Sequence, residues 1–243
     1  MTYLFISILL VEREMMTLTI TSPLTTERLV LRPFSSDDLD DLYTIHSSPE
    51  VVRYLYWDVR SRDEVEEVLR HKSRQTILAT EGDRLVLAIT APRPDGIRSR
   101  VIGEVSLWWR SVEHSQGEIG FVLHPDYHGK GFARESATVV LDLAFRKLGL
   151  HRVYGRTDAR NTASAALMRR LGMRQEAHFI QNEVFKGEWG DELVFAILQH
   201  EWLVQHHNDT TGLRVIDDRG RGIGGPLPPG AVSESESPGA SHD

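Results

Sequence analysis

Residues 117–145, GEIGFVLHPDYHGKGFARESATVVLDLAF, join a strand-like segment, a glycine-rich turn and a helical pattern in direct succession. The first seven residues have the composition of a strand, which stops before Pro125. Beyond the turn, apolar residues from Ala137 to Leu148 recur at intervals of three, one and three. This spacing predicts a helix with one buried face that ends near Gly149.

The turn carries two glycines and two cationic side chains. Gly129 and Gly131 flank Lys130, and Arg134 follows at the start of the predicted helix. Backbone N–H groups and the dipole at a helix N-terminus attract anions, so this arrangement suits a phosphate or pyrophosphate. It has neither the GxxxxGK(S/T) spacing of a P-loop nor the third glycine of a dinucleotide fold. From spacing alone, a phosphate site and an ordinary strand-to-helix turn both stay open.

The rest of the chain alternates between strand and helix patterns, which predicts a mixed α/β layer. A first helix begins at Ser35 or Ser36, with acidic residues in its first turn. Further helices are predicted at residues 62–73 and 161–172. Strands are predicted at residues 26–34, 77–91, 101–109, 117–123, 152–158, 176–186 and 191–202.

Composition restricts the partners and the chemistry. The 243 residues carry a formal net charge of -7, which disfavours nucleic acid as a main partner. The chain contains 0 cysteines, which excludes disulfides, thiolate zinc sites and a cysteine nucleophile. We expect no metal, no membrane partner and a cytoplasmic location.

The two ends differ from the middle. We expect residues 1–16 to be an N-terminal extension, either translated from an upstream start codon or a real amphipathic segment, with an apolar run too short to span a bilayer. Residues 207–243 are rich in Gly, Pro, Ser and acidic residues and are expected to form a disordered tail. Residues 17–206 are then the single folded domain.

Several segments together resemble one family. HGKGFA at residues 128–133 resembles the (R/Q)xxGx(G/A) coenzyme A signature of the GNAT superfamily of N-acetyltransferases. TERLVLRPF before it, and NTASAALMRRLGMRQEA and KGEWGDELVFAIL after it, occur in the order found in the RimJ/RimL-like branch, which includes protein Nα-terminal acetyltransferases. The resemblance covers about residues 26–204. His128 departs from it, because the signature usually carries Gln or Arg at that position.

The resemblance implies a fold and a cosubstrate. The fold is a mixed, mostly antiparallel sheet with helices on both faces, in which strands 117–123 and 152–158 lie parallel but splay apart. Acetyl-CoA would enter this opening, with its pyrophosphate on the turn and its pantetheine arm on the strand backbone. Asn161 and Ser164 match the family's NxxS pattern, although each also suits the start of a helix. The implied cofactor-binding residues are Phe121, Val122, Leu123, His128, Gly129, Lys130, Gly131, Phe132, Ala133, Arg134, Asn161 and Ser164.

The implied chemistry is direct transfer of an acetyl group to an amine in a ternary complex. A carboxylate would remove the amine proton, and Glu118, Glu104 and Glu183 are the candidates. The resemblance favours Glu183 with Ser164 as its partner. Met168 stands where many members of the family have a tyrosine, so Ser164, water or an unassisted thiolate would complete the step.

The acceptor is open. Tyr54, Tyr56 and Trp57 lie in the stretch where this family builds one wall of the acceptor site, and we assign substrate binding to Tyr54 and Trp57. The acceptor would be a primary amine on a peptide N-terminus or a small molecule. The alternatives are an aminoglycoside or polyamine acetyltransferase, a longer-chain acyltransferase, and a non-catalytic acyl-CoA-binding module. A homodimer also stays open.

Overall fold

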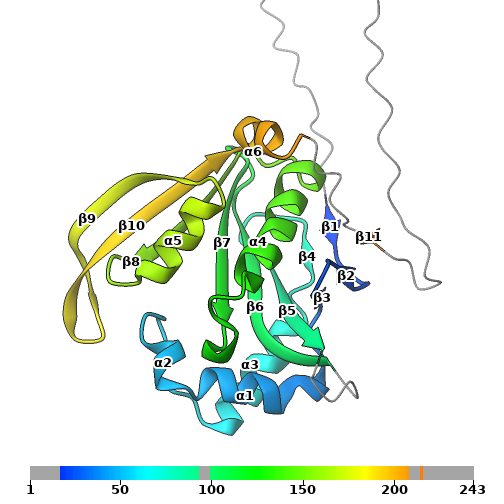
Figure 1. Ribbon diagram of the computed structural model, residues 1–243, viewed down its shortest axis with the longest axis vertical. Helices are drawn as coiled ribbons and strands as arrows, with labels where there is room; N and C mark the ends of the chain where they lie inside the picture. The colour runs from blue at the N-terminus through cyan, green and yellow to red at the C-terminus, as the bar shows by residue number, and fades with distance from the viewer. Residues whose placement is uncertain (1–16, 93–98, 208–213, 216–243) are drawn as a thin grey trace, which may run out of the picture.

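A computed structural model describes residues 17–92, 99–207 and 214–215 (Figure 1). In this part of the chain the main sheet has the strand order β11-β2-β3-β5-β6-β7-β8-β10-β9, and β1 pairs with β4 in a small separate sheet. The strands are β1 (Leu18–Thr19), β2 (Leu24–Thr25), β3 (Val30–Arg32), β4 (Ile77–Leu78), β5 (Arg84–Pro92), β6 (Ser99–Ser111), β7 (Gln116–Leu123), β8 (Arg152–Asp158), β9 (Arg174–Phe185), β10 (Glu188–Leu198) and β11 (Arg214–Val215). The helical segments are η1 (Ser36–Asp38), α1 (Leu39–His46), α2 (Pro49–Val52), α3 (Arg62–Lys72), η2 (Pro125–Tyr127), α4 (Phe132–Asp142), the π-helical η3 (Leu143–Lys147), α5 (Thr162–Arg170) and α6 (Gln199–Gln205).

Strands β7 and β8 form the parallel pair of the main sheet, and the other described neighbours are antiparallel. Their pairing runs only from Gln116 opposite Arg152 to Glu118 opposite Tyr154. Both strands continue beyond this point, β7 to Leu123 and β8 to Asp158, without pairing to each other. The mixed, mostly antiparallel fold with a splayed parallel pair is confirmed.

Helices pack on both faces of the sheet. Strand side chains alternate between the faces, so Ile119 on β7 joins the core cluster that contains residues of α4 and α5. Val122 on the same strand packs instead with residues of α1 and α3. Figure 1 shows α4 and α5 in front of the sheet, with α1, α2 and α3 gathered at its lower end. The opening between β7 and β8 therefore connects two faces that different helices cover.

The predicted elements differ from the observed ones at several places, among them the short strands β1, β2 and β11, which were not predicted, and the predicted strand 26–34, of which only Val30–Arg32 forms β3. The segment 77–91 is broken by a turn, because the Asp83 carboxylate accepts hydrogen bonds from the N–H groups of Ala79 at 2.7 Å and Thr80 at 2.8 Å. The short helix α2 was not predicted. The prediction of a strand to residue 202 was wrong, since α6 begins at Gln199.

Tertiary contacts explain α6. The Glu201 carboxylate accepts a hydrogen bond from the Leu198 N–H at 2.7 Å and so caps the helix. The indole of Trp202 is fully buried and donates to Asp142 on α4 at 2.7 Å. Its partner is far away in the sequence, so the local apolar pattern resembled the end of a strand.

The predicted ends lie largely outside the described residues. This holds for the N-terminal extension at residues 1–16 and for most of the tail at residues 207–243. Within the predicted tail, Arg214 and Val215 form β11 and pair with β2.

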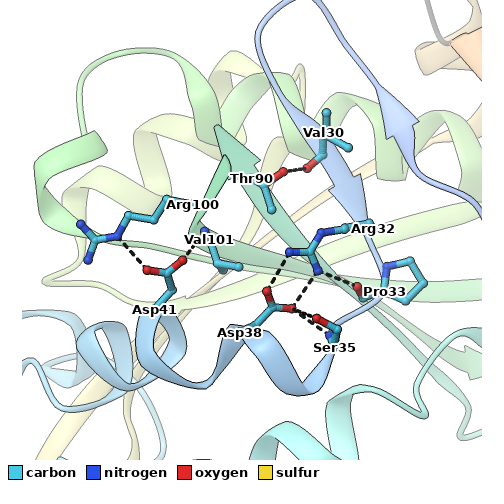
Figure 2. A network of polar contacts seen from close by, with 9 residues as sticks. All are labelled: Val30, Arg32, Pro33, Ser35, Asp38, Asp41, Thr90, Arg100 and Val101. Carbon is cyan, nitrogen blue, oxygen red and sulfur yellow. Dashed lines mark hydrogen bonds and ion pairs between the residues drawn. The ribbon is translucent and has the colours of Figure 1, made fainter. Parts of the chain in front are cut away.

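Two acidic residues, the buried Asp38 and the partly buried Asp41, attach the first helices to the sheet (Figure 2). Arg32 on β3 makes two hydrogen bonds with the Asp38 carboxylate, at 2.8 and 2.7 Å, and the Ser35 N–H donates to the same carboxylate at 2.8 Å. Asp41 on α1 accepts from the Val101 N–H at 2.9 Å and from Arg100 at 3.0 Å. These contacts fix the position of η1 and α1 against the sheet. They therefore also fix the point at which the segment between α1 and α3 begins.

We expect Asp38→Asn to lower the free energy of unfolding at pH 7 by about 1–3 kcal/mol, because it weakens charge-assisted bonds to a buried group. Burial alone would raise the pKa of Asp38, but the bonds from Arg32 and Ser35 outweigh it and lower the pKa. The carboxylate therefore stabilises the fold above its unfolded pKa, and this stabilisation is lost as the pH falls through its folded pKa. Urea denaturation at pH 7 and at acidic pH measures the difference, which shrinks in acid. Asp40→Asn, at a highly exposed side chain, is the control, and an undiminished difference in acid would contradict the assignment.

Candidate functional site

The glycine turn leads from η2 directly into α4. Gly129 has a φ of 72° and Gly131 has a φ of 82°, a region that side-chain-bearing residues rarely adopt. Gly131 is also the N-cap of α4, which begins at the next residue. The first N–H groups of this helix have no acceptor within the helix. The backbone is thus shaped for an anion at the position that the sequence predicted.

Arg28, which lies near the N-terminal end of the domain in the sequence, holds this turn through hydrogen bonds. Arg28 donates from Nη1 to the Lys130 carbonyl at 2.9 Å and from Nε to Glu135 at 2.8 Å. The Thr26 hydroxyl donates to the same carboxylate at 2.5 Å. The guanidinium also lies 4.8 Å from the centre of the Phe132 ring. Sequence reasoning used TERLVLRPF only for its resemblance and missed this contact, because the partners are about a hundred residues apart.

His128 ties the turn to the preceding strand. Its Nε2 lies 2.9 Å from the Leu123 carbonyl, to which it donates a hydrogen bond. Lys130 is exposed, and its ammonium lies 5.2 Å from the centre of the Tyr127 ring. Through its bond to the Leu123 carbonyl, His128 joins the turn before α4 to the end of β7.

A cavity of about 160 Å³ lies at the splay between β7 and β8. Its lining comes from both faces of the sheet. Ile119 and Met168 belong to the core cluster on the α4 side, whereas Glu104 and Glu118 occupy alternate positions on the opposite side. The predicted site residues in the lining are Tyr54, Trp57, Glu104, Glu118, Phe121, Val122, Asn161, Ser164 and Glu183. The predicted residues outside it are Leu123, His128, Gly129, Lys130, Gly131, Phe132, Ala133 and Arg134, at the end of β7 and on the turn that follows.

Helix α5 contributes the NxxS residues. The side-chain oxygen of Asn161 accepts a hydrogen bond from the Ser164 N–H at 3.1 Å, so Asn161 is a helix N-cap and also lines the cavity. One turn later, Met168 is buried, and its sulfur lies 2.8 Å from where a Cβ at Gly155 would stand. A larger residue at position 155 would therefore close the splay against Met168.

The three candidate bases have different partners. Glu104 is buried and lies 2.7 Å from the Lys72 ammonium. Glu118 pairs with Arg110 at 2.5 Å and with Arg156 at 3.4 Å. Lys72 holds the pKa of Glu104 well below its usual range and so weakens it as a base, while Glu118 is already engaged by two cations.

Glu183 accepts a hydrogen bond from the Tyr56 hydroxyl at 2.5 Å and forms no ion pair within the described part of the chain. Burial and the Glu183 carboxylate raise the pKa of the Tyr56 hydroxyl, which therefore stays a neutral donor. Of the three candidates, Glu183 is the one whose geometry best suits proton removal.

The family comparison agrees with this architecture. Residues 28–174 match the family model described as an acetyltransferase (GNAT) domain. The chain belongs to the GNAT acetyltransferase family. It is an N-acetyltransferase, an enzyme that transfers an acetyl group to an amine.

Individual relatives of this GNAT chain are similar over most of their length. It is 29% identical to YnaD of Bacillus subtilis, named as an uncharacterized N-acetyltransferase, over 74% of this chain and 98% of the relative. It is 23% identical to the spermidine N(1)-acetyltransferase of Escherichia coli, over 72% of this chain and 89% of the relative. A crystal structure of the spermidine N-acetyltransferase of Vibrio cholerae in complex with CoA and spermine has the same fold. Its TM-score is 0.61 at 23% identity, covering 73% of this chain and 99% of that one.

The far wall of the GNAT cavity joins two segments that are distant in the sequence. The Lys186 ammonium lies 2.9 Å from the Val52 carbonyl, 3.1 Å from the Trp57 carbonyl and 3.0 Å from Asp58. The rings of Tyr56 and Phe185 meet edge to face at 5.5 Å. We call residues 53–61 the aromatic loop; these contacts hold it against the tip of the β9–β10 hairpin, which approaches α2 in Figure 1. Sequence reasoning selected Tyr54 and Trp57 but missed Lys186, whose signal in KGEW is only a turn.

Within the described residues of this GNAT chain, no group of three or more His, Asp or Glu side chains is arranged to hold a metal ion. In the same part of the chain, no helix is both long and apolar enough to cross a membrane.

Proposed function

We propose that this acetyltransferase moves the acetyl group of acetyl-CoA directly to a primary amine, on a peptide N-terminus or a small molecule, and that it belongs to the RimJ/RimL-like branch. One observation carries the proposal. The opening between β7 and β8 has the glycine turn beyond one end of β7, and Glu183, a carboxylate without a described ion pair, in the lining of its cavity. A homodimer and a cytoplasmic location stay predictions of the sequence.

The cofactor side fits the shape of coenzyme A. The positive φ values at Gly129 and Gly131 let the backbone approach a pyrophosphate closely. Phe121, Val122 and Leu123 pair with β6 on one side but not with β8 on the other. Apart from the Leu123 carbonyl, which accepts from His128, their backbone groups on the open side need polar partners, which the amides of a pantetheine arm provide. Acetyl-CoA bound there supplies an activated thioester carbonyl.

The acceptor side supplies the proton transfer. We assign Glu183 as the general base, which takes the amine proton directly or through one water, and Tyr56 as the residue that orients its carboxylate. We assign the Ser164 hydroxyl, which lines the cavity from α5, as the proton donor to the departing sulfur. Glu118 then has an electrostatic role, since it is paired with Arg110 and Arg156.

A polyamine is the second candidate for the acceptor. Five carboxylates and two guanidinium groups line the cavity, so its field attracts a cation. The similarity to a spermidine N(1)-acetyltransferase supports the same alternative.

Release of free thiol from acetyl-CoA tests the proposed function. The purified chain is incubated with acetyl-CoA and either a peptide with a free N-terminus, spermidine or an aminoglycoside. The expected result is amine-dependent release with at least one of them and an acetylated product by mass spectrometry. Acetyl-CoA binding without release for any amine would overturn the catalytic assignment.

Gly131→Val tests the cofactor turn. A side chain at this position must adopt an unfavourable φ, and its Cβ would lie 3.3 Å from the Arg28 guanidinium. We expect CoA binding, measured by isothermal titration calorimetry, to weaken at least about tenfold, which corresponds to about 1.4 kcal/mol. Gly82→Val is the matched control, because Gly82 also has a positive φ of 92° but nothing within 4 Å of an added Cβ, in the turn between β4 and β5. Equal CoA affinities in the two variants would remove the turn from the site.

A further inference from the structure

Four buried polar atoms belong to side chains in the wall of the cavity or directly behind it, on β5, β6, α1 and the aromatic loop. They are Nε2 of His46, Nε1 of Trp57, Nε of Arg84 and Oε2 of Glu104, and none has a hydrogen-bond partner among the described residues. Trp57, Arg84 and Glu104 line the cavity, and the His46 ring stacks on Trp57 at 5.6 Å. Buried polar atoms are almost always paired. Four unpaired atoms in the wall of a pocket or directly behind it indicate a group that the protein alone does not supply.

Their neighbours hold these side chains in place. The other Glu104 oxygen accepts from Lys72 at 2.7 Å, and Nη2 of Arg84 donates to Ser106 at 3.1 Å. Arg60 donates to Nδ1 of His46 at 2.9 Å. An arginine only donates, so Nδ1 is the acceptor and the proton of the neutral His46 ring is on Nε2. This Nε2 lies 3.8 Å from Oε2 of Glu104, beyond hydrogen-bond distance.

The unpaired set therefore offers three N–H donors and one carboxylate acceptor. An ammonium group only donates, so the second amine of a polyamine would leave the donors unpaired and would stand near Lys72 and Arg84. A carboxylate only accepts, so it would face Oε2 of Glu104 with no proton between them. An amide or a hydroxyl both accepts and donates, and it satisfies both kinds of atom.

We propose that Trp57, Arg84, Glu104 and His46 form a polar subsite for a neutral amide or hydroxyl group carried by the same molecule as the reacting amine. The inference rests on the proposed function and narrows it. It selects a peptide-like or hydroxylated amine over a simple polyamine. Leaving such buried groups unpaired is unfavourable, so an acceptor that lacks the polar group is bound less well.

Matched amines test the subsite. Alaninamide carries an amide, alaninol a hydroxyl, alanine a carboxylate, and isopropylamine no second polar group. We expect kcat/KM for alaninamide or alaninol to exceed that for isopropylamine, alanine and spermidine by at least about tenfold, the effect of one hydrogen bond to a buried group. Whichever of alaninamide and alaninol has the higher kcat/KM shows whether the subsite prefers an amide or a hydroxyl group. Equal values, or a preference for spermidine or alanine, would overturn the subsite.

Trp57→Phe tests one of its donors. Phenylalanine keeps an aromatic ring against His46 but removes the indole N–H, so kcat/KM for the preferred polar amine should fall several-fold more than for isopropylamine. Trp189→Phe is the matched control, because Trp189 is 63% exposed and lies outside the cavity lining. An equal fall for both amines would assign Trp57 a packing role alone and overturn its part in the subsite.

A binding measurement separates this inference from the proposed function. Calorimetry of alaninamide, alaninol and isopropylamine, each in the presence of saturating CoA, requires no turnover. Tighter binding of the amide or the hydroxyl, lost in Trp57→Phe, supports the subsite even if no amine releases thiol. Binding of isopropylamine as tight as that of both polar amines overturns it, whether or not the enzyme turns over.

Discussion

Glu183→Gln is expected to lower kcat for amine acetylation by about a hundredfold or more, within the range that a positioned general base contributes. Glutamine keeps the shape and can still accept from the Tyr56 hydroxyl, which lies 2.5 Å from Oε1 of Glu183, but it cannot take a proton.

Steady-state rates with saturating acetyl-CoA at a fixed neutral pH measure this loss. Glu188→Gln is the matched control on the same hairpin, because Glu188 is exposed and pairs only with Arg160 among the described residues, at 3.2 Å. CoA affinity should be equal in the two variants. A loss of less than about threefold in Glu183→Gln would assign the proton transfer to another group or to water.

Lys72→Met is expected to lower the free energy of unfolding by about 3–5 kcal/mol at pH 7, since it leaves a buried carboxylate without its cation. Burial alone would raise the pKa of Glu104, but the charge of Lys72 outweighs it and the pKa lies well below its usual range. The paired carboxylate therefore stabilises the fold above its unfolded pKa. Without Lys72, burial dominates and raises the pKa of Glu104, so the destabilisation should be largest at neutral pH and shrink in mild acid.

Urea denaturation of a double-mutant cycle measures this coupling. Adding Glu104→Gln to Lys72→Met removes the uncompensated charge, so most of the lost stability should return. Lys147→Met, at an exposed lysine, should change stability little. If the double variant is less stable than Lys72→Met, the ion pair is not the source of the effect.

The elements around the cofactor turn could be predicted because their signals are local. Strand β8 was predicted at residues 152–158 and is observed there, and α3 differs from its prediction by one residue at its end. The two glycines of the turn have positive φ values, a backbone conformation for which glycine is the preferred residue. Glycine at these positions was therefore an informative signal in the sequence. Helix α6 could not be predicted in the same way, since the bond between Trp202 and Asp142 that positions it joins residues 60 apart.

The acceptor side of the site depends on contacts at long range. Tyr56 and Glu183 are 127 residues apart, and Lys72 and Glu104 are 32 apart. Each of these residues alone resembles an ordinary surface or core position. Only the folded sheet shows that, among the described residues, Glu183 has no ion pair and one oxygen of Glu104 has no hydrogen-bond partner.

The early end of the pairing between β7 and β8 has a consequence for how the substrate range of this enzyme changes. The proposed groove for the cosubstrate is built from main-chain groups of β7 and from the glycine turn, so many side-chain replacements along β7 leave those groups in place. The opposite wall consists of side chains on the aromatic loop and the hairpin tip, which meet at Lys186. Loops tolerate substitution and insertion better than the strands that carry them. A new acceptor preference is therefore most readily acquired by exchanging these two loops together, while the donor half of the reaction is inherited unchanged.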